Sequence, residues 1–185
     1  MGVMTTMFTI CLEYLPERHI ENRLNFIAQI TETDDQNLFR HVLWTDESRF
    51  VSNGLPNRRN EHYWSIENPH IVNPVQNQGH FGVNVWCGII GRHLIGPYFY
   101  EHTLNSVSYL NFLQEELPAL LENVPLQLRR NLWFQHDGAP PHKARIVQQY
   151  LDNTFPEKWI GLNGPIQWPG KLPNLTPLNF FYRGF

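Results

Sequence analysis

The sequence predicts an α/β domain in which a mixed sheet of five strands is flanked by helices. Short apolar runs bounded by turn residues recur along the chain, which is typical of buried strands. Between them lie longer stretches with apolar residues three and four positions apart, which is typical of amphipathic helices. The length of 185 residues and the hydrophobic content of 42% fit one folded domain rather than a disordered chain.

The N-terminal part begins with residues of weak pattern. A helix is predicted from Pro16 to Ile30, because a proline suits the first helical turn and the apolar residues then fall on one face. The first strand is predicted at Val42 to Thr45. We therefore divide the chain into an irregular N-terminal segment with one helix, residues 1–37, and a main domain, residues 38–185.

The middle of the chain predicts a hairpin followed by a helix. Phe81 to Ile90 alternates and then becomes wholly apolar, as a central strand does, and Leu94 to Tyr100 is the return strand. Pro97 indicates an edge or an irregularity in that return strand. Ser106 to Leu121 has helical periodicity, and Pro118 is expected to kink or break the helix near its end.

The C-terminal part repeats strands and helices. Leu132 to Gln135 is predicted as a strand, Pro141 to Phe155 as a helix and Pro165 to Trp168 as a short strand. The start of a last helix follows. Because the sequence stops at Phe185, that helix is expected to be short or missing.

Two aspartates follow apolar runs that are far apart in sequence. Asp137 comes after Leu132 to Phe134, and Asp46 comes after Val42 to Trp44. Adjacent strands of one sheet would bring the two carboxylates together. Carboxylates held rigidly at the ends of buried strands are suitable ligands for a hard divalent cation such as Mg²⁺. These two aspartates are therefore the candidate metal ligands.

Composition limits the partners. The formal net charge is −3, whereas a duplex-binding module usually has a clear positive excess, so any DNA contact must depend on local patches or on another domain. Cys11 and Cys87 are the only cysteines, which favours a reducing compartment. No stretch approaches the ~20 consecutive apolar residues of a membrane span.

The roles of Arg58, Arg59 and His142 each have two interpretations. Arg58 and Arg59 lie among aromatic and amide residues, which fits a patch that touches phosphate and stacks on bases, or an ordinary solvated hairpin with its aromatics turned inward. His142 follows Asp137 by five residues, near the start of a predicted helix. It is expected either to approach the aspartates or a DNA phosphate, or to face solvent.

Four blocks of the sequence carry a family resemblance: Trp44 to Ser48, Asn84 to Ile89, His136 to His142 and Trp168 to Phe181. Together they resemble the catalytic domain of mariner-superfamily transposases, which has a ribonuclease H-like fold. The resemblance implies DNA cutting and strand transfer during transposition and integration, transposon-end DNA as partner, a possible homodimer and a nuclear location. It also implies two Mg²⁺ or Mn²⁺ ions held by three carboxylates.

The sequence departs from the family at the third acid. Asp46 and Asp137 match the first two carboxylates, but Asn174 stands at the third, and Asn179 replaces a further aspartate. A neutral amide is a weaker anchor for a dication, so the resemblance implies weakly bound metal and impaired catalysis. The alternative is a non-catalytic DNA-binding or inert remnant of a transposase. Glu47 is not expected to substitute, since adjacent strand residues point to opposite faces.

Overall fold

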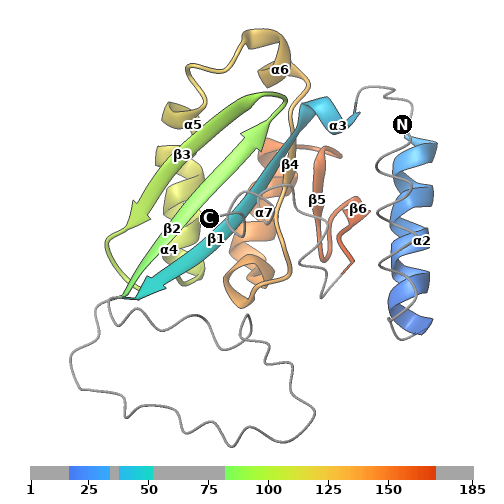
Figure 1. Ribbon diagram of the computed structural model, residues 1–185, viewed down its shortest axis with the longest axis horizontal. Coiled ribbons are helices and arrows are strands. Elements are labelled where there is room, and N and C mark those ends of the chain that lie inside the picture. Colours follow the sequence, from blue (N-terminus) through green and yellow to red (C-terminus); the bar gives the residue numbers. More distant parts are fainter. Residues whose placement is uncertain (1–16, 34–37, 52–81, 170–185) are drawn as a thin grey trace, which may run out of the picture.

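A computed structural model describes residues 17–33, 38–51 and 82–169 of the chain (Figure 1). Within these ranges the chain forms helices and strands in the following order: α2 (Glu17–Glu32), α3 (Leu38–His41), β1 (Val42–Val51), β2 (Gly82–Ile90), β3 (His93–Tyr100), α4 (Ser106–Asn111), the π-helix η1 (Phe112–Glu116), α5 (Leu117–Leu120), α6 (Leu126–Arg130), β4 (Trp133–Gln135), the 3₁₀-helix η2 (Pro140–Lys143), α7 (Arg145–Thr154), β5 (Trp159–Gly161) and β6 (Ile166–Gln167). None of the described helices is long and apolar enough to cross a membrane.

The strands form one mixed sheet in the order β3-β2-β1-β4-β5-β6. The pairs β1–β2 and β2–β3 are antiparallel, and β4, β5 and β6 continue the sheet in parallel from β1. The predicted α/β class and mixed sheet are confirmed, but the predicted number of five strands is wrong, because the sheet has six. The missed strand is Trp159–Gly161, three buried residues that are too short to show a period.

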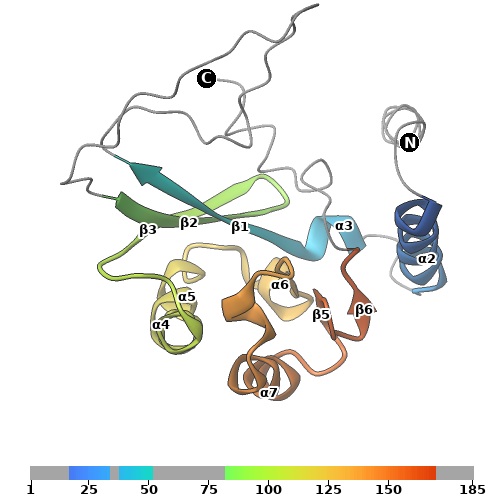
Figure 2. The same ribbon diagram turned by 90° about the horizontal axis from the view of Figure 1, so that it is seen from below.

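Alternate residues along the central strands enter two hydrophobic clusters on opposite faces of the sheet. Leu43 and Phe134 belong to the main cluster, which also includes side chains of α4 and α7, on the face that these helices cover in Figure 2. Trp44 and Trp133 belong to a second cluster with Phe26 of α2. This alternation is the period of two that a strand imposes, and it explains why the central strands are apolar on both faces.

Two predicted elements differ in extent from the observed ones. Strand β1 continues to Val51, because it pairs with β2 over its whole outer half, so Asp46 lies within the strand and not at its end. The predicted helix from Ser106 to Leu121 is divided by the π-helix just before Pro118. That division is the irregularity expected of a proline near a helix end. Pro97 lies in β3, which is an edge strand, as predicted.

Candidate functional site

Two aspartates lie where the pairing of β1 with β4 ends. Trp44 in β1 is paired with Gln135 in β4. Asp46 and Asp137 follow two residues later on each segment. Two hydrogen bonds from Thr45 support this register: its N–H donates to Gln135 Oε1 at 3.0 Å, and its hydroxyl donates to the Gln135 carbonyl at 2.6 Å. Strands β1 and β4 are therefore neighbours, as expected, with Asp46 inside β1 and Asp137 two residues beyond the end of β4.

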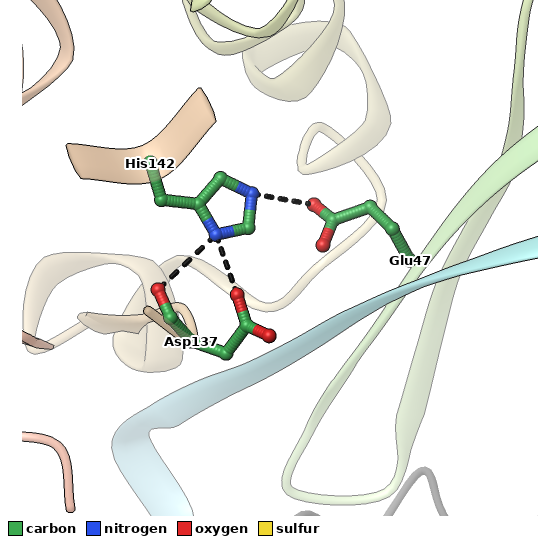
Figure 3. A group of neighbouring side chains, drawn as sticks. All are labelled: Glu47, Asp137 and His142. Carbon is green, nitrogen blue, oxygen red and sulfur yellow. Dashed lines mark hydrogen bonds and ion pairs between the residues drawn. The ribbon is translucent and has the colours of Figure 1, made fainter. Parts of the chain in front are cut away.

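Asp137 begins the turn that leads from β4 into η2. Its Oδ1 accepts a hydrogen bond from the Ala139 N–H at 2.9 Å and one from His142 Nδ1 at 2.7 Å. The same His142 nitrogen lies 3.1 Å from the Asp137 carbonyl oxygen (Figure 3). The prolines that open η2 fix the chain direction there, and this brings His142 back over the aspartate.

His142 is buried at the centre of the site. It is 2% exposed, and its ring stacks on His136 with centroids 4.8 Å apart and an interplanar angle of 12°. Tyr109 of α4 covers it with a centroid distance of 4.2 Å. Of the two interpretations left open by the sequence, the solvent-facing one is wrong. Its burial also argues against a direct phosphate contact, so we place His142 in the site and not on a DNA-binding surface.

Glu47, which was not expected to substitute for the third acid, lies beside His142. Its Oε1 lies 3.4 Å from His142 Nε2, and the ligand atoms of Glu47, Asp137 and His142 all lie within 4.8 Å of one another (Figure 3). Alternation does put Glu47 on the face of Leu43, opposite to Asp46. The 3₁₀-helix η2 carries His142 to the face of Glu47, so the cluster includes a face that the sequence alone did not indicate.

Burial and neighbouring charges shift the pKa values of the acidic residues and of His142 in the site. Burial raises the pKa of Asp46 to about 7, and the nearby charges of Glu47 and Asp137 add to the effect. Burial alone would lower the pKa of His142, but the charge of Glu47 and the hydrogen bond with Asp137 raise it to about 10. Burial opposes ionisation of Asp137 too, yet the hydrogen bond from His142 holds its pKa below the ordinary value.

His136, a second buried histidine, stacks on His142 but is neutral. His136 is 2% exposed, and burial together with the charge of His142 lowers its pKa well below the ordinary value. Its Nδ1 lies 3.3 Å from the Tyr109 hydroxyl. A neutral His136 is therefore a flat surface on which the charged His142 ring is stacked. The sequence block from His136 to His142 contained both rings, but nothing in it indicated their stacking.

Three predicted site residues lie outside the described part of the chain: Arg58, Arg59 and Asn174. Their roles stay predictions, as does metal binding by Asp46 and Asp137. Acidic oxygens and one imidazole nitrogen are ligand types that divalent cations accept.

The comparison with known proteins agrees with this architecture. The chain is 28% identical over 138 residues, 74% of its length, to the transposable element Tc3 transposase of Caenorhabditis elegans, of which it covers 38%. No protein-family model matches. Among solved structures, the catalytic domain of Mos1 mariner transposase matches with a TM-score of 0.57 and 20% identity, over 91% of this chain and 69% of that one. The Mos1 paired end complex with Mn matches with a TM-score of 0.59 and 21% identity, over 91% of this chain and 48% of that one.

The chain is thus similar in sequence to Tc3 transposase and in fold to the catalytic domain of Mos1 mariner transposase. Its fold is accordingly ribonuclease H-like, as the resemblance implied. The transposase-like chain spans little more than a third of the Tc3 protein and about half of the Mos1 chain in the paired end complex. Activity and partners of those longer proteins are therefore matters for proposal here.

Proposed function

We propose that this chain is a transposon-derived DDE-type domain that acts in cutting and joining DNA, with Asp46 and Asp137 as its metal-binding acids. The observation that supports the proposal is the β1–β4 register, because Asp46 and Asp137 each follow the paired segments by two residues. The similarity to Tc3 transposase supports the reaction class. Transposon-end DNA is the proposed partner, since related Mos1 structures hold such ends, and a homodimer and a nuclear location are part of the same proposal.

The charge pattern fits a divalent cation. The pKa of Asp46 is raised to about 7 by burial and by the charges of Glu47 and Asp137, so the acids repel one another in the absence of a counter-charge. A cation among them would remove that repulsion. Mg²⁺ and Mn²⁺ prefer oxygen ligands, and when bound to such a site they activate a nucleophile and stabilise the leaving oxygen of a phosphodiester. The protein's own part is to hold Asp46 on β1 and Asp137 just after β4, its neighbour in the sheet.

A second candidate function is a domain that binds DNA without cutting it, or an inert remnant. It is favoured by Asn174, which stands where the resemblance implies the third acid. An amide contributes no negative charge, so cation binding and catalysis would both be weakened. We propose that the unaltered chain is catalytically impaired for this reason, and that its two family ions are weakly bound.

One experiment separates the two functions. The purified chain is incubated with a generic DNA duplex and Mn²⁺, beside the variants Asp46→Ala and Asn174→Asp. Impaired transposase chemistry predicts little or no cleavage by the unaltered chain, more by Asn174→Asp and none by Asp46→Ala. Cleavage by the unaltered chain that is lost in Asp46→Ala would contradict the impairment but support the site. If Asn174→Asp binds DNA yet never cleaves it, the non-catalytic function is favoured.

A further inference from the structure

We propose that Glu47 and His142 form a site for a divalent transition-metal ion, with Glu47 Oε1 and His142 Nε2 as its ligands and with Asp137 orienting the histidine ring. The site shares Asp137 with the proposed transposase chemistry. Metal binding there does not require that the domain cut DNA. The metal site and the proposed DNA-cutting function can therefore be tested separately.

The geometry between Glu47 and His142 fits two ligands of one ion. Glu47 Oε1 and His142 Nε2 are 3.4 Å apart. Two ligands of a tetrahedral ion with bonds of about 2.0–2.1 Å are separated by about 3.4 Å, which follows from the tetrahedral angle. The separation is long for a charge-assisted hydrogen bond, which is usually about 2.7–2.9 Å. An ion between the two atoms would satisfy both without a large movement.

The same two atoms lack hydrogen-bond partners although they are buried. Neither Glu47 Oε1 nor His142 Nε2 has one, and the side chains are only 11% and 1% exposed. Buried polar atoms are nearly always hydrogen-bonded, and each unsatisfied one calls for an explanation such as an unseen ion. Here the two unsatisfied atoms face each other across the site (Figure 3).

The opposite edge of the His142 ring is already held as in known metal sites. Nδ1 donates to Asp137 Oδ1 at 2.7 Å, which leaves Nε2 directed toward Glu47. Histidines that bind metals commonly donate their second nitrogen to a carboxylate, which fixes the ring orientation and strengthens the ligand. We infer that Asp137 orients the ring through this bond, while His142 Nε2 and Glu47 are the groups that bind the ion.

The ligand set selects the kind of cation. Mg²⁺ binds oxygen ligands and rarely imidazole, whereas Mn²⁺ and Zn²⁺ accept one imidazole nitrogen beside carboxylate oxygens. Participation of His142 therefore predicts preference for a transition-metal ion over Mg²⁺. The competing explanation is a plain ion pair, in which a protonated His142 is held between Glu47 and Asp137 and no metal binds.

The test measures binding of Mn²⁺, Zn²⁺ and Mg²⁺ to the full chain by calorimetry, with pulsed electron paramagnetic resonance of bound Mn²⁺ to detect a coordinated nitrogen. We expect Mn²⁺ and Zn²⁺ to bind at least about tenfold more tightly than Mg²⁺. Glu47→Gln and His142→Asn should each weaken Mn²⁺ binding by about 10- to 100-fold. The nitrogen coupling should be present in the unaltered chain and absent in His142→Asn.

Matched controls make the same chemical changes at exposed positions. Glu122→Gln and His102→Asn should leave both the affinity and the nitrogen coupling unchanged. The proposal is overturned if the unaltered chain shows no nitrogen coupling, if it binds no Mn²⁺, or if Glu47→Gln binds as tightly as the unaltered chain. If His142→Asn does not fold, the nitrogen coupling of the unaltered chain and the affinity of Glu47→Gln still decide.

The DNA-cleavage assay is independent of these readings. Nitrogen-coupled Mn²⁺ that depends on Glu47, together with an Asn174→Asp variant that never cleaves DNA, would support the metal site and count against the proposed function. Cleavage that depends on Asp46, with Mn²⁺ affinity indifferent to Glu47→Gln, would do the reverse.

Discussion

The two halves of strand β1 lie in very different surroundings. Val42, Leu43 and Trp44 are at most 7% exposed and pack into hydrophobic clusters on both faces of the sheet. Beyond Thr45 the strand carries Asp46 and Glu47, which are partly buried beside further charges. The inner half contributes to stability by removing apolar surface from water. The outer half keeps like charges together in a way that opposes stability.

This difference indicates where function lies. Natural proteins tolerate a destabilising arrangement mainly at sites where the arrangement serves activity or binding. Repulsion raises the pKa of Asp46, and His142 is the only side chain in the described site that offers a compensating positive charge. The inner half of β1 should therefore respond to mutation as a core does, and the outer half should respond in the opposite sense.

The largest expected effect is in the core that packs around the inner half of β1, at Phe134 of the neighbouring strand β4. Phe134 is 0% exposed, pairs with Leu43 in the sheet and stacks on Phe155 with a centroid distance of 5.5 Å. Phe134→Ala would leave a cavity between the sheet and α7. We expect the free energy of unfolding to fall by about 3–5 kcal/mol, measured by urea denaturation. The control Phe99→Ala, at a position 57% exposed, should change it by less than about 1 kcal/mol. Equal losses in the two variants would contradict the distinction.

The inner half was also the easier part to predict from sequence. Apolar runs such as Val42 to Trp44 indicate buried strands, because burial on both faces of a sheet requires apolar residues at successive positions. The block around Asp137 likewise indicated a strand, a turn and a helix. Strand β5 was not predicted from the sequence, because three residues are too few to show an alternation of apolar and polar side chains. Its position in the sheet is set by its pairing with β4.

The sequence indicated Asp46 and Asp137 directly, and His142 only as one of two alternatives. Asp46 and Asp137 follow apolar runs, which is a local signal. The contact of Glu47 with His142 depends on where η2 carries the histidine, and the ring contact of His142 with Tyr109 joins segments 33 positions apart (142 − 109). Such contacts are consequences of tertiary packing and leave no pattern in the local sequence.

A smaller effect of opposite sign is expected in the outer half. The pKa of Asp46 is raised from 3.8 to about 7, so between those pH values the unfolded chain releases a proton that the folded chain retains. Stability is therefore lost as pH rises from about 4 to about 7, and the loss is complete above that. A difference of this size corresponds to about 4 kcal/mol, and solvent screening of a partly exposed carboxylate reduces it, so we expect about 1–3 kcal/mol.

The variant Asp46→Asn should therefore be more stable than the unaltered chain at pH 8 by about 1–3 kcal/mol, and nearly equal to it at pH 4. The measurement is thermal unfolding of both proteins across this range without divalent cations. The matched change Asp152→Asn tests for a general effect of charge removal. It should lack the gain, since the Asp152 carboxylate accepts a hydrogen bond from the Trp159 indole at 3.0 Å. Destabilisation by Asp46→Asn at pH 8 would show that the acids of the site do not repel one another.

The smallest expected effect is at the boundary between the two halves. Thr45 is 2% exposed, and its hydroxyl donates to the Gln135 carbonyl at 2.6 Å, one residue before Asp46. Thr45→Val keeps the shape and the strand preference but removes this bond, so the free energy of unfolding should fall by about 1 kcal/mol. The N–H bond from Thr45 to Gln135 Oε1 at 3.0 Å remains, so the register and the neighbourhood of Asp46 and Asp137 should be kept. We therefore expect Mn²⁺ affinity to fall by no more than a few-fold, in contrast to Glu47→Gln.

The control Thr31→Val makes the same change at an exposed helix position, where the hydroxyl donates to the Ile27 carbonyl at 2.7 Å. It should alter the free energy of unfolding by less than about 0.5 kcal/mol. If Thr45→Val costs no more than Thr31→Val, backbone pairing alone holds the register, and the side-chain bonds of Thr45 do not contribute to placing the two aspartates.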